Sequence, residues 1–152
     1  MKGARFAGHP IHPALVHFPL ALWAATWVWD VLGAWTGSLV WWQTGFWCLV
    51  AGSVMALPAA ITGLMELALL ENTPAEDVAM RHMLAMGSAF AVYVTALIVR
   101  AGAAPPDGWR LYAALALSTA GVGLLALGGW YGGRMVYEYG VGGASPKPDR
   151  PG

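Results

Sequence analysis

Charged side chains are scarce in this sequence of 152 residues. Only 11% of the residues are Asp, Glu, Lys or Arg, whereas 58% are hydrophobic. Soluble domains usually carry about 25% charged residues, so most of the surface of this protein need not face water. The formal net charge is zero, and no basic patch indicates that the protein binds nucleic acid. The composition therefore favours a protein embedded in a lipid bilayer.

Cysteine is also nearly absent, since Cys48 is the only one in the sequence. A disulfide within the chain is excluded, and the C-x-x-C pairs of thiolate metal sites are missing, so we interpret Cys48 as a small buried hydrophobic residue.

The first apolar segment lacks a small-residue cleavage pattern, and we expect it to be retained as a helix. The sequence shows no phosphate-binding loop, no paired catalytic carboxylates and no nucleophile with a base. We therefore expect no enzymatic activity from this chain on its own.

Four apolar segments are each long enough to span a bilayer, which takes about 20 residues. Their limits are approximately 13–35, 43–70, 74–99 and 109–134. The links between them are short, which makes neighbouring helices antiparallel. The sequence thus predicts an all-α integral membrane protein, a four-helix bundle with up-down topology formed by residues 1–141. A Gly- and Pro-rich tail, residues 142–152, is expected to be disordered, and no internal repeat is evident.

Local patterns refine the limits of the helices. The segment 73–76, with the sequence TPAE, has the pattern of a capping box with proline in the first helical position, which predicts the start of the third helix. Pro58 is expected to kink the second helix. Two interpretations stay open at Pro19: the first helix is kinked there, or it begins there with His17 close to its N-cap.

Three of the four histidines occur in one short stretch, GHPIHPALVHFP, which covers residues 8–19. A proline disfavours helical geometry in the residue before it, so we expect His9 and His12 to be extended or in turns, folded back over the end of the bundle. The antiparallel topology brings this stretch to the same membrane face as the fourth histidine, His82. The other polar residues expected at that face include Glu66, Arg81, Arg134 and Tyr137. The opposite face offers only Asp30, Arg100, Asp107 and Arg110.

One interpretation of this polar face is a haem site. His17 and His82 are at similar depths on two helices that start on the same side, and two such imidazoles can ligate haem b. Arg81 and Arg134 would then bind the haem propionates. The overlapping G-x-x-x-G patterns within residues 128–133 let a neighbouring helix or a flat ligand come close.

Other interpretations of the same residues stay open. His9 and His12, together with the two histidines above, provide four imidazoles, enough for a zinc or copper site. The histidines can also be ordinary interfacial side chains, and Arg134 can form a simple i,i+4 ion pair with Glu138. The protein would then be a metal-handling protein or a cofactor-free anchoring subunit of a larger complex.

The stretches GHPIHPALVHFPLAL (residues 8–22) and GGRMVYEYGVG (residues 132–142) together resemble a known family. They are similar to the small four-helix bacterial membrane proteins grouped as a domain of unknown function, with an HPxHPxxVHFP opening and a GGxxVYxxGVG ending. The T-G-L-x-E segment at residues 62–66 and the dipeptide Arg81-His82 agree with this resemblance. Some relatives carry a fused Rieske-type iron–sulfur domain, which implies electron transfer, although this chain lacks the cysteines of that domain.

The leading hypothesis is therefore a haem-b subunit that transfers electrons within a membrane redox complex, with other redox subunits or a quinone as partners. Lys and Arg residues are more numerous on the side of the termini, where we expect Lys2, Arg5, Arg81, Arg134, Lys147 and Arg150. The positive-inside rule then predicts a multi-pass protein of the inner membrane with both termini in the cytoplasm.

Overall fold

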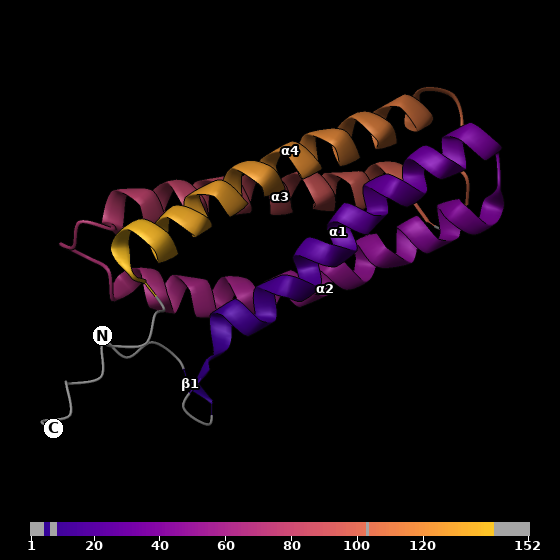
Figure 1. The fold of residues 1–152 in the computed structure, drawn as a ribbon. Helices are drawn as coiled ribbons and strands as arrows, with labels where there is room; N and C mark the ends of the chain where they lie inside the picture. Colours follow the sequence, from indigo (N-terminus) through magenta and orange to yellow (C-terminus); the bar gives the residue numbers. More distant parts are fainter. Residues whose placement is uncertain (1–4, 7–8, 103, 142–152) are drawn as a thin grey trace, which may run out of the picture.

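Four long helices make up most of the structure, a computed structural model that describes residues 5–6, 9–102 and 104–141 (Figure 1). A two-residue antiparallel pair, β1 (Arg5–Phe6) with β2 (His9–Pro10), precedes them. The helices are α1 (Ile11–Thr36), α2 (Leu39–Ala68), α3 (Glu76–Arg100) and α4 (Gly108–Tyr139). All four are long and apolar enough to cross a membrane. The predicted all-α fold of four membrane-spanning helices is confirmed.

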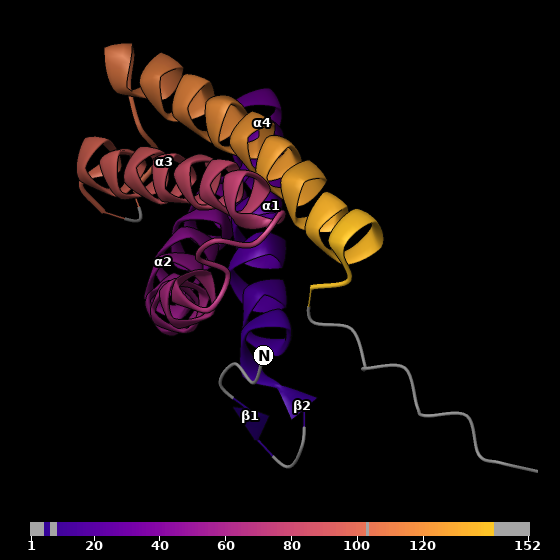
Figure 2. The same cartoon turned by 90° about the vertical axis from the view of Figure 1, so that its left-hand side faces the viewer.

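The helices alternate in direction, so the bundle has two distinct ends (Figure 1). The starts of α1 and α3 lie with the ends of α2 and α4 at one end, which we call the terminal end. The α1–α2 and α3–α4 loops lie at the other, the far end. Helices α1 and α2 pack together as the first hairpin, and α3 and α4 pack together as the second. The two hairpins meet where α1 contacts α4 and α2 contacts α3. Figure 2 shows this arrangement along the bundle.

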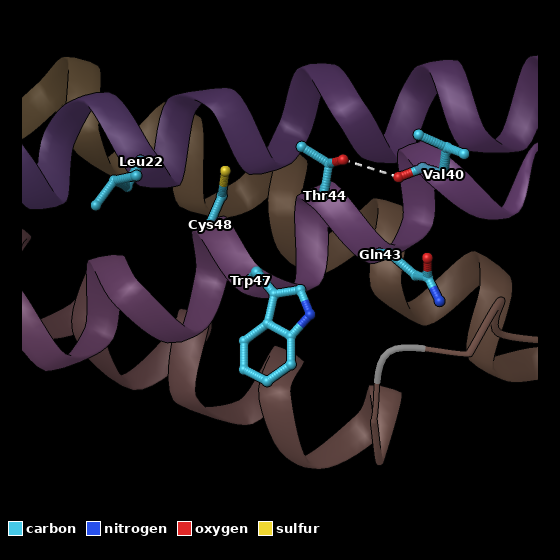
Figure 3. A pocket seen from close by; sticks show the side chains of 6 residues that line it. All are labelled: Leu22, Val40, Gln43, Thr44, Trp47 and Cys48. Atoms are coloured by element: carbon cyan, nitrogen blue, oxygen red, sulfur yellow. Dashed lines mark hydrogen bonds between the residues drawn. The ribbon is translucent and has the colours of Figure 1, made fainter.

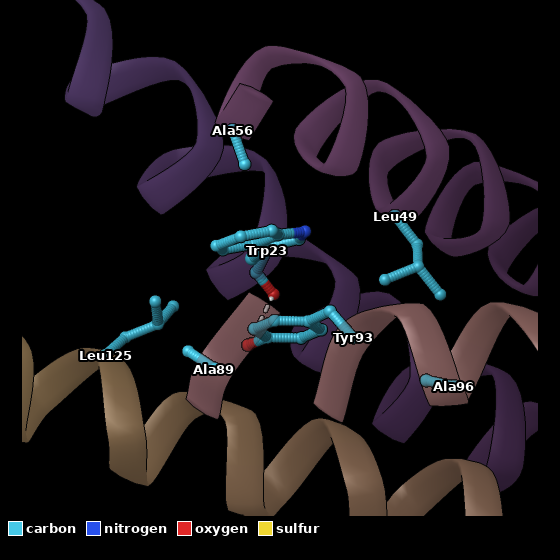
Figure 4. Close-up of a cluster of buried hydrophobic side chains, with 7 residues drawn as sticks. All are labelled: Trp23, Leu49, Ala56, Ala89, Tyr93, Ala96 and Leu125. Carbon is cyan, nitrogen blue, oxygen red and sulfur yellow. Dashed lines mark hydrogen bonds between the residues drawn. The ribbon is translucent and has the colours of Figure 1, made fainter. Parts of the chain in front are cut away.

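Large apolar side chains cover the outside of the bundle, while the interior is built mostly from small ones. Exposed examples are Trp35, Val40, Trp47, Ile98 and Trp130. Monomeric soluble proteins rarely expose large continuous apolar patches, whereas lipid covers such a surface without cost. Inside, Trp23 and Tyr93 stack with ring centroids 4.6 Å apart, surrounded by alanine and leucine side chains (Figure 4). Small residues at helix contacts are typical of bundles in membranes.

The start of α1 differs from the expected one. The helix begins at Ile11 and runs without a break through Pro19, so the interpretation in which it starts at Pro19 is wrong. His12 is therefore helical rather than extended, because Pro13 falls in the first turn, where a missing N–H group loses no intrahelical bond. His9, in β2, is extended as predicted.

The link between α2 and α3 also differs in detail, since the expected capping box does not form. The helix begins at Glu76, after Ala75, and makes no side-chain cap. The Glu76 carboxylate instead accepts a hydrogen bond from the Asn72 N–H at 2.6 Å, and the Thr73 hydroxyl donates to the Leu70 carbonyl. Both polar side chains thus stabilise the turn rather than the first helical N–H groups.

The end of α4 lies beyond the expected limit. The helix passes through its glycine-rich segment and stops at Tyr139, where Gly140 adopts a left-handed conformation with φ of 67°. Glycine is favoured at such a helix end because it has no Cβ to clash. The tail predicted to be disordered, residues 142–152, lies outside the described residues.

The buried positions of the two hairpins recur at a nearly constant spacing, a pattern that the residue types alone did not reveal. All five buried residues of α4 lie 69 positions after buried residues of α2: Ala114, Ser118, Gly121, Leu125 and Gly128 follow Gly45, Leu49, Gly52, Ala56 and Ala59. Between the first helices of the hairpins the spacing is 70, and Ala89, Tyr93, Ala96 and Arg100 follow Pro19, Trp23, Thr26 and Asp30. Few of these pairs keep the same residue type, which hides the repeat in the sequence.

Candidate functional site at the terminal end

His12 occupies the inner side of the first turn of α1 and contacts α2. Its Nδ1 donates a hydrogen bond to the Ala59 carbonyl at 2.9 Å and lies 3.2 Å from the Thr62 hydroxyl oxygen. The ring packs on the backbone of Gly63, where an added Cβ would lie only 2.8 Å from His12 Cε1. Glycine at position 63 is therefore required for this placement of the imidazole.

His82 has the same surroundings in the second hairpin. Its Nδ1 donates to the Gly128 carbonyl at 2.8 Å, and its ring lies beside Gly132, where a Cβ would be 3.4 Å from Cε1. His82, Gly128 and Gly132 follow His12, Ala59 and Gly63 at the repeat spacings of 70 and 69. One of the two overlapping G-x-x-x-G patterns, that of Gly128 and Gly132, thus receives His82 and Met86 from α3.

These contacts fix that Nδ1 is protonated in both rings. A carbonyl oxygen can only accept a hydrogen bond, so Nδ1 carries the proton in each histidine. In a neutral imidazole the lone pair is then on Nε2, the atom left to bind a ligand. Metal-binding histidines are held in this way, with the other ring nitrogen donating to a carbonyl or carboxylate. His12 and His82 are thus oriented alike, each against the second helix of its own hairpin.

The other residues expected at the site lie around this pair without joining it. His17 is exposed on α1, because five residues turn a helix by roughly 140° and carry it away from the side of His12. His12, rather than His17, is therefore the α1 histidine whose contacts match those of His82. Arg81 and Tyr137 are exposed, and Glu66 is half-buried. The side chain of His9 lies outside the described residues.

Arg134 forms an ion pair with a residue of its own helix. It donates hydrogen bonds to the Glu138 carboxylate, with the shortest at 2.7 Å, so the alternative of an i,i+4 ion pair describes it correctly. Where side chains are described, no group of three or more His, Cys, Asp or Glu residues is arranged to hold a metal ion. The paired histidines are therefore the arrangement with ligand chemistry at this end.

Sequence reasoning missed a buried ion pair near the far end. Arg100 Nη1 donates to Asp30 Oδ1 at 2.6 Å, and Nη2 donates to the Trp42 carbonyl at 2.8 Å. Both charged side chains are at most 2% exposed. The guanidinium also lies 5.5 Å from the Trp42 ring and 5.8 Å from the Phe46 ring. A charge inside a membrane span is costly without a partner, and this cost was the available signal that the two residues meet.

A surface pocket between α1 and α2 lies away from the histidines (Figure 3). Its lining includes Thr44, whose hydroxyl already donates to the Val40 carbonyl of its own helix, and Cys48, a partly buried free thiol. Trp47, also in the lining, is largely exposed. These side chains form no recognisable catalytic or metal-binding arrangement.

Comparison with known proteins agrees with the architecture. No curated protein and no solved structure matches the chain. A family model described as "Predicted membrane protein (DUF2231)" matches residues 8–145, a range that includes all four helices and both histidines of the pair. The chain therefore belongs to the DUF2231 family of predicted membrane proteins.

Proposed function

We propose that this membrane protein holds one haem b between His12 and His82 and transfers electrons within a membrane redox complex. The observation that carries the proposal is the matched pair of imidazoles, each tied through Nδ1 to a carbonyl of the neighbouring helix. The ties leave both Nε2 atoms as ligands and hold the rings against rotation. A neutral histidine with a free Nε2 is the common axial ligand of haem iron.

The number of ligands favours haem over a bare zinc or copper ion. Structural zinc sites use four protein ligands and catalytic ones three, whereas the matched pair provides two. Haem needs only one or two axial ligands from the protein, since the macrocycle supplies the other four. Two histidines at the junction of two hairpins satisfy that need.

The residues around the pair have distinct roles in this proposal. Gly63 keeps space beside the His12 ring, because a Cβ there would lie 2.8 Å from Cε1, and Gly132 lies beside the His82 ring. Arg81, exposed next to His82, provides a cation for a propionate, whereas Arg134 would have to leave Glu138 to do so. When bound, haem b supplies one-electron transfer. The site lies at the terminal end, where a partner subunit or a quinone can approach it from the membrane surface.

The visible spectrum of the purified protein tests this function. We expect protein from membranes of cells supplied with ample haem to show a Soret band that shifts on reduction, with one iron per chain by elemental analysis. Zinc or copper without iron would contradict haem and support a metal-handling protein. Protein with neither haem nor metal would contradict both and support an anchoring subunit.

A further inference from the structure

Three pairs of equivalent residues on α1 and α3 are each separated by 70 positions, the repeat spacing: His12 and His82, Trp23 and Tyr93, and Asp30 and Arg100. The second and third of these pairs are in direct contact between the hairpins. In a two-fold arrangement, a residue can approach its own equivalent only at the axis, because half a turn carries every other position to the opposite side. The stacked rings and the 2.6 Å ion pair therefore mark the axis. It runs along the bundle, and both hairpins point in the same direction about it (Figure 1).

Most positions along this axis do not distinguish the first hairpin from the second. The histidine pair is identical, and Trp23 and Tyr93 are both large aromatic residues. Gly52 and Gly121 make equivalent room for these aromatic side chains. Two copies of the first hairpin, or two of the second, would satisfy the same packing rules at these positions.

The third pair does discriminate between the hairpins. Two first hairpins would bring Asp30 against Asp30, and two second hairpins would bring Arg100 against Arg100. Like charges buried in an apolar interior are strongly unfavourable, so only unlike hairpins give a compensated pair. Specific association commonly relies on such a repulsive element against the wrong partner.

The surroundings of the ion pair agree with this role. Arg100 reaches across to both helices of the first hairpin, to Asp30 on α1 and to the Trp42 carbonyl on α2. Gly45 makes room for the carboxylate, since a Cβ there would lie 2.9 Å from Asp30 Oδ1. Arg100 Nε is buried and has no hydrogen-bond partner within the described part of the chain. Asp30 is the carboxylate paired with this guanidinium in the described part of the chain.

We infer that this chain is a fused dimer of one two-helix unit, and that the buried Asp30–Arg100 pair determines that unlike hairpins associate. The inference depends on the packing of the hairpins and is independent of any ligand at the histidines. Its consequence is that the two hairpins stay together without the covalent link between them, as long as the charges at positions 30 and 100 are opposite.

A cleavable full-length protein tests this consequence. A protease site is inserted between Glu71 and Asn72, which are both exposed, and the folded protein is cut in detergent. We expect the two hairpins of the parent protein to co-purify. Asp30→Asn or Arg100→Gln should weaken their association at least ~100-fold, since removing one partner of a buried ion pair leaves an uncompensated charge. Arg110→Gln is the matched control: it removes an exposed cation at the same end and should change nothing.

The exchange Asp30→Arg with Arg100→Asp distinguishes pairing from a general loss of folding. Opposite charges face each other again in this variant, so its hairpins should co-purify better than those of either single variant. The inference is overturned if the hairpins of the single variants stay together as firmly as the parent ones. It is also overturned if the exchange variant is no better than the single variants, including the case in which these do not fold.

Discussion

At the scale of single residues, the histidine site depends on glycines as much as on histidines. The imidazole of His12 can pack against α2 as it does only because Gly63 has no side chain, whereas the ring of His82 lies beside Gly132 at ordinary contact distance. The sequence identified all four histidines as candidates, but the hypothesis drawn from it paired His17 with His82 as haem ligands. Helix periodicity puts His12 and His17 on different sides of α1. That argument requires both residues to be helical, and this was known only from the structure, in which α1 begins at Ile11.

The glycine under His12 gives a direct prediction. In Gly63→Ala the new Cβ would lie 2.8 Å from His12 Cε1, and such overpacking typically costs about 1–3 kcal/mol. We therefore expect a lower free energy of unfolding in detergent and loss of the His12–Ala59 hydrogen bond. Gly87→Ala is the control, because a Cβ there meets nothing within 4 Å. Removal of a helical glycine should leave that variant as stable as the parent or more stable by up to about 1 kcal/mol. Equal stability of the two variants would contradict the described packing.

At the scale of helices and loops, the sequence predicted the number, order and approximate limits of the helices, because long apolar segments and short links leave few alternatives. It was less successful where a polar side chain has several possible partners. In the α2–α3 turn, Glu76 accepts from Asn72, and Thr73 donates to Leu70, in place of the expected reciprocal cap. Asn72 itself has a positive φ of 60°, which nothing in the sequence required.

The turn predicts that Glu76 stabilises the start of α3. Glu76→Ala removes the acceptor of the 2.6 Å bond from the Asn72 N–H, and loss of a comparable helix-end contact costs about 0.5–2 kcal/mol. Chemical or thermal unfolding should show this loss, whereas Asp77→Ala, an exposed neighbour in the same turn, should cost less. If Asp77→Ala proves to be the more damaging change, the described turn is wrong.

At the scale of the whole molecule, the repeat could not be read from the sequence because its pairs have diverged. Trp23 corresponds to Tyr93 and Asp30 to Arg100, so residue identity at the repeat spacing is low even though every buried residue of α4 has a buried counterpart in α2. The role of each position is the same in both hairpins. Gly52 and Gly121 make room for aromatic rings, and equivalent residues contact each other between the hairpins. The sequence did place His12 and His82 toward the same end of the bundle, which follows from topology alone.

The topology predicts where reporters fused to the chain are active. Four spanning helices put both ends of the chain on one side, and the positive-inside rule favours the cytoplasm for that side. A reporter fused after Gly152 should be active only in its cytoplasmic form. One inserted between α3 and α4, within residues 101–107, should be active only in its periplasmic form. The same activity at both places would contradict four spans, and the reverse pattern would contradict the orientation alone.

Haem occupancy in single-histidine variants tests the proposed site most directly. His12→Ala and His82→Ala should each lower the haem bound per chain by about tenfold or more, or convert its spectrum from two axial histidines to one. Both should lower the unfolding temperature of the haem-loaded protein, because bound ligand stabilises the folded state. His17→Ala, on the exposed side of α1, should keep the parent occupancy and spectrum. Unchanged occupancy and spectrum in both the His12 and His82 variants would contradict the site, as would loss of haem in the His17 variant alone.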